Sequence, residues 1–110
     1  MIRVKVTYRE DCICSLEVTG HAGYAEHGSD IVCAAVSVLV TTTINGIERL
    51  AGFTPLTEVD DVEGGYLYTE MPSDCLKEQT SQLLLQNLVD GLNDVRQEYP
   101  DYLSLKEITL

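Results

Sequence analysis

A histidine and a cysteine, both able to do chemistry, stand twelve residues apart in a glycine-rich stretch. The stretch runs from Gly20 to Cys33 and has the sequence GHAGYAEHGSDIVC. It joins the end of a predicted strand to the start of a predicted helix, so that His21 leaves the strand and Cys33 enters the helix. With Ser29 or Asp30 as the helix N-cap, Cys33 would fall in the first turn. There, unpaired amide N–H groups and the helix dipole favour a thiolate.

An imidazole beside that thiolate would complete an activated nucleophile. A protonated His21 would stabilise the sulfur anion and could then pass its proton to a leaving group. The amides around Cys33 could also donate hydrogen bonds to a developing oxyanion. Each residue alone has a structural interpretation, because buried cysteines and loop histidines are usually inert. Their combination at a strand end and a helix start is more informative than either residue.

Neighbouring side chains are candidates for supporting roles. Ser37 follows Cys33 by four residues and so lies one turn further on the same helix face. It could serve the site, or it could donate to the backbone carbonyl of Cys33. Asp30 could cap the helix or orient His21, and His27 is expected to be a solvent-exposed loop residue. These residue types can bind metal, but they lack close paired spacing, so we expect no metal site.

Composition and charge exclude several classes of protein. The chain has 110 residues, 45% of them hydrophobic, and a net charge of −11, which predicts one core and one domain over residues 1–110. Duplex nucleic acid is not an expected partner, because phosphate binding needs clustered Lys and Arg. No apolar run reaches the roughly 20 residues of a membrane helix, and no signal peptide is evident. We therefore expect a cytoplasmic protein that binds neither nucleic acid nor membrane.

The cysteines and the acidic residues are consistent with this expectation. The thiols are expected to be reduced, and their spacing matches no zinc module. Cys12 and Cys14 share a strand face with Leu16 and Val18, which predicts that both are small buried residues. The half of the chain from 56 to 110 holds twelve acidic residues against three basic ones. This charge either keeps the surface solvated or attracts a basic partner. The four cysteines are Cys12, Cys14, Cys33 and Cys75.

The elements around the reactive stretch are five predicted strands and two predicted helices. Alternation of apolar and polar residues predicts a hairpin that turns at Glu10-Asp11 and ends at Gly20, and three later strands. A phase slip in the last strand, between Leu105 and Ile108, could mark a bulge. The predicted strands are residues 2–9, 12–18, 56–60, 66–71 and 102–110.

The two helices differ in how clearly the sequence predicts them. Between Ile31 and Phe53, β-branched residues and Asn45-Gly46 favour a hairpin, whereas a continuous apolar run with Gly52 at its end favours a buried helix. We expect the helix. The second helix is predicted from a cap at Ser73 or Asp74 to Tyr99, before Pro100, by a stripe of Leu85, Leu88, Leu92, Val95 and Tyr99. The order β-β-α-β-β-α-β predicts an α+β, two-layer fold with two helices packed on one face of a mainly antiparallel five-stranded sheet.

The stretch from Gly20 to Ser37 closely resembles the signature of the ribosomal-processing cysteine protease family, called Prp. GHAGYA, then Gly28, then DIVCAAVS carry the resemblance, which extends along the chain in length and element order. It favours a helix at Asn45-Gly46. It also implies a cysteine endopeptidase without cofactor, in which Cys33 is the nucleophile and His21 the general base. Asp30 and Ser37 match supporting positions, and a loop that would close on substrate is matched by Ala22, Gly23, Tyr24, Gly28 and Ser29.

The resemblance also implies a substrate and an assembly. The family removes a short, largely apolar N-terminal extension, cut beside aromatic residues, from the twenty-seventh protein of the large ribosomal subunit during ribosome maturation. It also forms homodimers. Three alternatives remain: a non-catalytic ribosome-associated binding or assembly module in which Cys33 and His21 only pack, a thiol redox protein with a resolving cysteine, and a hydrolase of small thioesters that uses the same pair.

Overall fold

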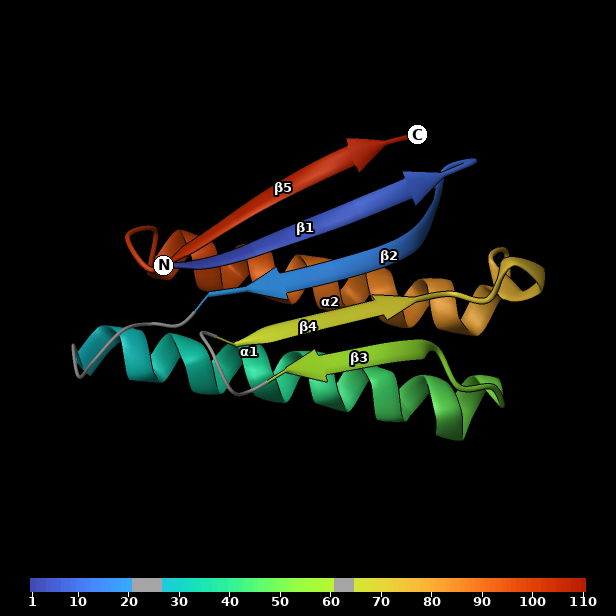
Figure 1. The fold of residues 1–110 in the computed structure, drawn as a ribbon, viewed down its shortest axis with the longest axis horizontal. Helices are drawn as coiled ribbons and strands as arrows, with labels where there is room; N and C mark the ends of the chain where they lie inside the picture. Colours follow the sequence, from blue (N-terminus) through green and yellow to red (C-terminus); the bar gives the residue numbers. More distant parts are fainter. Residues whose placement is uncertain (21–26, 61–64) are drawn as a thin grey trace.

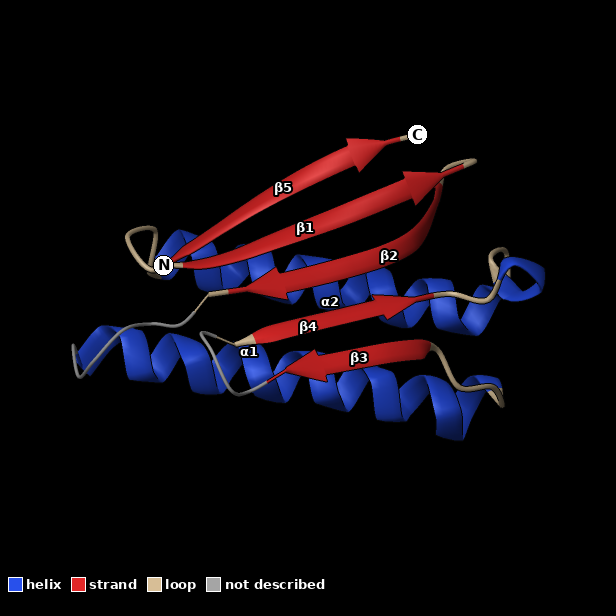
Figure 2. Cartoon of the chain, viewed as in Figure 1, coloured by secondary structure: helices blue, strands red, loops and turns tan. Residues whose placement is uncertain are grey.

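The computed structural model describes residues 1–20, 27–60 and 65–110, with the backbone alone for residues 27–30. In this part of the chain a five-stranded sheet forms one layer and two long helices form the other (Figures 1 and 2). The predicted α+β architecture and element order are confirmed. The strands are β1 (Ile2–Arg9), β2 (Cys12–Thr19), β3 (Leu56–Asp60), β4 (Tyr66–Glu70) and β5 (Leu103–Thr109). The helices are α1 (His27–Gly46), extended by a π-helical turn (Ile47–Ala51), and α2 (Gln79–Glu98), preceded by a 3₁₀ turn (Ser73–Cys75).

The strand order in the sheet is β3-β4-β2-β1-β5, and every neighbouring pair is antiparallel except β1 and β5. β5 pairs with β1 in unbroken register, so the bulge expected in the last strand is wrong. The irregularity lies in the first hairpin instead, where Thr7 pairs with Ser15 but Tyr8 pairs with Ile13. Cys14 is therefore the extra residue of a β-bulge.

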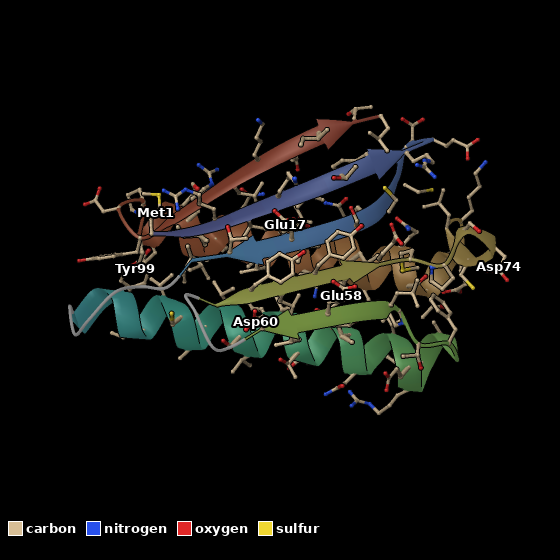
Figure 3. All side chains as sticks on the ribbon, viewed as in Figure 1. Met1, Glu17, Glu58, Asp60, Asp74 and Tyr99 are labelled. Atoms are coloured by element: carbon tan, nitrogen blue, oxygen red, sulfur yellow. The ribbon has the colours of Figure 1, made fainter. Side chains whose placement is uncertain are left out.

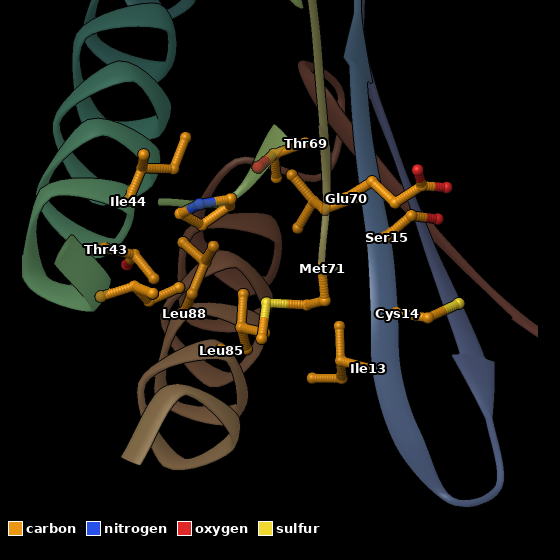
Figure 4. A pocket seen from close by; sticks show the side chains of 13 residues that line it. Ile13, Cys14, Ser15, Thr43, Ile44, Thr69, Glu70, Met71, Leu85 and Leu88 are labelled. Atoms are coloured by element: carbon orange, nitrogen blue, oxygen red, sulfur yellow. The ribbon is translucent and has the colours of Figure 1, made fainter. Parts of the chain in front are cut away.

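The bulge changes which side chains of β2 are buried. Ile13 is 2% exposed in the core, whereas Cys12 and Cys14 are only half-buried, so the expectation that both cysteines are buried is wrong. The physical reason is that an extra residue reverses the inward and outward alternation beyond it. Figure 4 shows the result, with Ile13 directed toward Leu85 and Cys14 on the other side of β2.

The apolar segment after residue 30 is a helix, as expected, and not a hairpin at Asn45-Gly46. Gly52 ends it in the left-handed conformation, at φ 82°, and its N–H donates to the carbonyl of Ile47. The buried side of α1 carries Val32, Val36 and Val40, each at most 4% exposed.

The other side of α1 is not covered by the described residues, so the expectation of a buried helix is only partly right. Ile31 is 41% exposed and Val38 is 64% exposed. Residues 31–51 are long and apolar enough to cross a membrane by length and composition, contrary to expectation, and 28% of the most apolar window is buried. The same criterion is met by core helices of other proteins, and α1 packs along the sheet and α2 (Figure 1).

The second helix begins later than expected. Ser73 and Asp74 belong to a 3₁₀ turn, and α2 starts at Gln79 with Glu78 as its N-cap. The Glu78 carboxylate accepts hydrogen bonds from the backbone N–H groups of Thr80 (2.9 Å) and Ser81 (2.7 Å). These bonds lower the pKa of Glu78 below its ordinary value. The predicted end at Tyr99 is confirmed.

Candidate active site

A groove of about 480 Å³ lies between α1 and the ends of β2, β3 and β4. Cys33, Ser37 and Thr41 line it from α1 at intervals of four residues, which places them on one face of the helix. Cys33 is half-buried, and Ser37 and Thr41 are exposed. The strands contribute an apolar wall that includes Val18, Val59 and Leu67. The groove therefore offers a cysteine sulfur at one side of an apolar channel.

Two glycines form the rim where β2 ends and β4 begins. The N–H of Gly20 donates to the carbonyl of Gly65 at 3.1 Å, and both residues line the groove. Gly20 has φ 91°, and a Cβ there would stand less than 3.0 Å from the carbonyl oxygen of Met1. Only glycine fits this position without displacing the backbone. Figure 3 shows Met1 at the same end of the sheet.

The structure brings Cys33 and Ser37 together on the groove, as the sequence predicts. His21, the proposed general base, lies outside the described residues, as do Ala22, Gly23 and Tyr24. For Gly28, Ser29 and Asp30 the backbone is helical, within the first turn of α1, which begins at His27. The expectations that His27 lies in a loop and that Gly28 and Ser29 belong to a substrate loop are therefore wrong for the backbone. The roles of these residues stay predictions.

The position of Cys33 in α1 corrects part of the electrostatic argument. α1 begins at His27, so neither Ser29 nor Asp30 is the N-cap, and Cys33 is the seventh helical residue rather than part of the first turn. At a rise of 1.5 Å per residue it lies about 9 Å from the helix start, beyond the first turn in which the dipole acts. Its amide also falls within the i to i−4 hydrogen-bonding pattern of the helix. Activation by free amides, and an oxyanion contact from the Cys33 amide, are therefore not supported.

The sequence analysis missed most of the residues that line the groove, among them Thr41, Val59 and Leu67. Thr41 continues the spacing of Cys33 and Ser37 by a further turn, so helical periodicity could have identified it. Val59 and Leu67 carried no usable signal, because their place in the groove depends on how β3 and β4 pair in the folded chain.

A second cavity lies in the core, between β2, α2 and the π-helical turn (Figure 4). Its volume is about 10 Å³, room for at most one water molecule, and apolar side chains such as Met71, Leu85 and Leu88 line most of it. It has no space for a ligand. Among the described side chains, those of residues 1–20, 31–60 and 65–110, no group of three metal-ligating residues occurs.

The face of the sheet turned away from the helices is acidic beside the groove. Tyr68 on β4 pairs with Glu17 on one side and Glu58 on the other, and Figure 3 shows both carboxylates on this face. The Tyr68 hydroxyl donates to Glu70 at 2.9 Å. Desolvation, followed by the charges of Glu17 and Glu58, raises the pKa of Tyr66. Carboxylates of β2 and β3 thus flank the tyrosines of β4 on this face.

Known proteins resemble this chain in both sequence and fold. Residues 1–104 match the family model for cysteine protease Prp. The ribosomal processing cysteine protease Prp of Bacillus subtilis is 42% identical over 93 residues, which cover 83% of this chain and 82% of that protein. The crystal structure of SMU.848 from Streptococcus mutans has a TM-score of 0.94 at 33% identity and covers 100% of this chain and 96% of that one.

Two crystal structures of the Staphylococcus aureus ribosomal processing protease Prp also superpose on the fold. One holds a covalently linked product peptide (TM-score 0.80, 27% identity) and the other a substrate peptide (TM-score 0.78, 26% identity). Each covers 97% of this chain and 99% of the other. A family match over almost the whole length, together with close relatives of the same fold, shows that this chain belongs to the Prp family of cysteine proteases.

Proposed function

We propose that this protease removes the N-terminal extension of the twenty-seventh protein of the large ribosomal subunit, with Cys33 as nucleophile and His21 as general acid and base. One observation carries the proposal: the half-buried Cys33 lines an apolar groove whose rim is Gly20, the residue directly before His21. The proposal assigns His21 to this groove because it directly follows Gly20 in the sequence.

The reaction divides peptide hydrolysis into two acyl transfers. The Cys33 thiolate attacks the scissile carbonyl carbon, and the tetrahedral adduct collapses to a thioester as the C–N bond breaks. The His21 imidazolium gives its proton to the leaving amine. The neutral imidazole then takes a proton from water, which attacks the thioester and releases the carboxylic acid product, and the acid loses its remaining proton to the solvent. This last step restores the thiolate and the imidazolium.

The positions of the other cysteines argue against the redox alternative. Cys14 precedes Gly20 by six residues of extended chain, a separation of about 20 Å. The N–H of Met71 donates to the carbonyl of Cys14. Cys75 follows Met71 by only four residues and therefore belongs to the same end of the sheet as Cys14. A disulfide needs Cα atoms within about 7 Å, so none of these thiols is placed to resolve Cys33.

The nature of the groove and the charge of the chain both support the proposed substrate. An apolar wall suits a largely apolar extension, and a net charge of −11 attracts the basic body of a ribosomal protein. Raising the salt concentration should therefore slow cleavage of the intact ribosomal protein more than cleavage of a short neutral peptide. Equal salt dependence for both would remove the electrostatic part of the proposal.

The deciding experiment is to mix the protein with the extended ribosomal protein and to read the product masses. Cys33→Ala should still bind the substrate and should leave it uncut. In a non-catalytic binding module the same substitution would leave the function intact. Cys75→Ala is the matched control, because Cys75 is a free cysteine at the other end of the sheet and should leave cleavage unchanged. A Cys33→Ala variant that cleaves as fast as the wild type would refute the proposal.

The proposal also places the enzyme in the cytoplasm as a homodimer. The exposed apolar residues of α1, Ile31 and Val38, are consistent with a surface that a second copy would cover. Sedimentation equilibrium of the purified protein measures the assembly directly, and a monomer at all concentrations would contradict it.

A further inference from the structure

Strand β3 forms one edge of the sheet, and all five of its residues are exposed. Its two faces nevertheless differ. The Thr57 hydroxyl lies 3.1 Å from the hydroxyl of Thr69, which is only 4% exposed, so Thr57 faces the helix side of the sheet. Side chains alternate along a strand, so Val59 faces the same side and Leu56 faces the opposite side. Val59 accordingly lines the groove that holds Cys33.

Val59 ends a row of apolar side chains that crosses four strands. It pairs with Leu67, Leu67 pairs with Val18, and Val18 pairs with Val4. Burial decreases along this row, from Val4 at 2% exposed, through Leu67 and Val18, which are half-buried, to Val59 at 57%. The row continues the core outward until it reaches the open groove, where the last aliphatic side chain has no covering group among the described residues.

We propose that Val59 is a specificity-determining residue, which receives an apolar side chain of the substrate and thereby completes this row. The inference rests on the proposed function and names a determinant within it. The stripe from Cys33 to Thr41 spans about 12 Å of helix, the length of about four extended peptide residues. Val59 and Cys33 line this same groove, so the side chain that meets Val59 belongs to a residue close to the scissile bond.

The same geometry explains how the groove would discriminate. A charged substrate side chain placed against Val59, Leu67 and Val18 would lose water and gain no partner, which is costly. An apolar side chain would lose only unfavourable hydration. A carboxylate introduced at residue 59 would reverse this preference, because it would favour a cationic side chain at that one substrate position.

The test uses the full-length protein and fluorogenic peptides that carry the ribosomal extension. In these peptides each position near the cut is in turn Leu, Asp or Lys. Val59→Asp should lower kcat/KM for the Leu peptide about tenfold at one position and raise the relative rate of the Lys peptide there. Val59→Ala should lower kcat/KM for the Leu peptide about threefold, and it should still prefer Leu over Asp and Lys at that position. Leu56→Asp is the matched control, since Leu56 is 60% exposed on the same strand but faces away from the groove, and it should keep the wild-type profile.

The outcomes separate this inference from the proposed function. If the wild type cuts the peptides but Val59→Asp and Leu56→Asp both keep its profile at every position, the inference is refuted and the protease assignment stands. If the wild type cuts none of the peptides, or Cys33→Ala cuts them equally well, the proposed function fails as well. Unfolding curves of Val59→Asp and Val59→Ala that match the wild type show that a changed profile is not caused by misfolding.

Discussion

Replacing Gly20 with alanine tests whether close backbone packing holds the rim of the groove. Two glycines of the chain provide a matched pair, because Gly20 and Gly52 both have positive φ, at 91° and 82°. A Cβ at Gly52 meets nothing within 4 Å, whereas one at Gly20 would overlap the Met1 carbonyl oxygen. Both variants suffer the left-handed strain of alanine, and only Gly20→Ala adds a steric conflict.

The expected losses of unfolding free energy differ accordingly. Left-handed strain costs about 1 kcal/mol at either position. At Gly20 the backbone must also move, which weakens the Gly20–Gly65 hydrogen bond by about 1 kcal/mol and strains the start of β1 by a similar amount. We therefore expect about 3 kcal/mol for Gly20→Ala and about 1 kcal/mol for Gly52→Ala. At roughly 5 °C per kcal/mol, the midpoints of thermal unfolding fall by about 15 °C and about 5 °C.

Thermal unfolding and urea denaturation of both variants measure these losses, and peptide cleavage below the unfolding midpoint measures the consequence for the site. Because His21 directly follows Gly20, Gly20→Ala should lose kcat/KM at temperatures where it is still folded. Gly52→Ala, at the far end of α1, should keep full activity. Equal losses of stability in the two variants would show that the approach to Met1 is not the constraint inferred here.

Three further variants test the scaffold and the site. The side-chain amide of Gln82 accepts a hydrogen bond from the N–H of Ile13 and donates one to the Ile13 carbonyl. Gln82→Leu should therefore lower the free energy of unfolding, measured by urea denaturation, by about 2 kcal/mol. The control Gln86→Leu, on the exposed face of α2, should lower it by less than about 0.5 kcal/mol. The folded-state pKa of Glu78 is lowered, so the stabilisation from its charge is present above the unfolded pKa and is lost as the pH falls through the folded pKa. The difference in unfolding free energy between the wild type and Glu78→Gln should therefore be large at pH 7 and small at pH 3. A difference that does not change with pH would contradict the role of Glu78 as the N-cap. Ser37→Ala should raise KM for the ribosomal peptide about fivefold with little change in kcat, since one hydrogen bond is worth about 1 kcal/mol; a fall in kcat alone would place Ser37 in the chemical step instead.

Local patterns predicted most of the fold because they report directly on which face of an element is buried. The alternation of Ile2, Val4 and Val6 and the stripe around Leu88 placed a strand and a helix correctly. The errors arose where a second element decides the outcome. The bulge at Cys14 depends on the register with β1.

The start of α2 illustrates a different reason for error. Ser73 and Asp74 are good caps by residue type, but a 3₁₀ turn uses them. Glu78, a less common N-cap type, supplies both carboxylate oxygens to the first free amides of α2. Competition among neighbouring local signals is decided by packing, so residue types alone did not select among them.

The candidate site divides in the same way. Cys33 was predicted from its place near the start of the expected helix, and Ser37 because it follows Cys33 by one helical turn. The fit of Gly20 against Met1 and the position of Val59 in the groove come from strand pairing across the sheet, between residues far apart in the sequence. No pattern within either segment contains that information.

The observed start of α1 changes which group must activate the sulfur. With Cys33 seven residues into the helix, the free amides at its N-terminus are about 9 Å away, and the dipole loses most of its effect beyond the first turn. The groove that Cys33 lines also holds apolar side chains such as Val36 and Val40, which do not stabilise an anion. If Cys33 is the nucleophile, as proposed, a cation must be brought to the groove, and His21 is the proposed source because it directly follows Gly20 in the sequence. The proposed mechanism therefore predicts that replacing His21 impairs catalysis more than altering the first turn of α1 does.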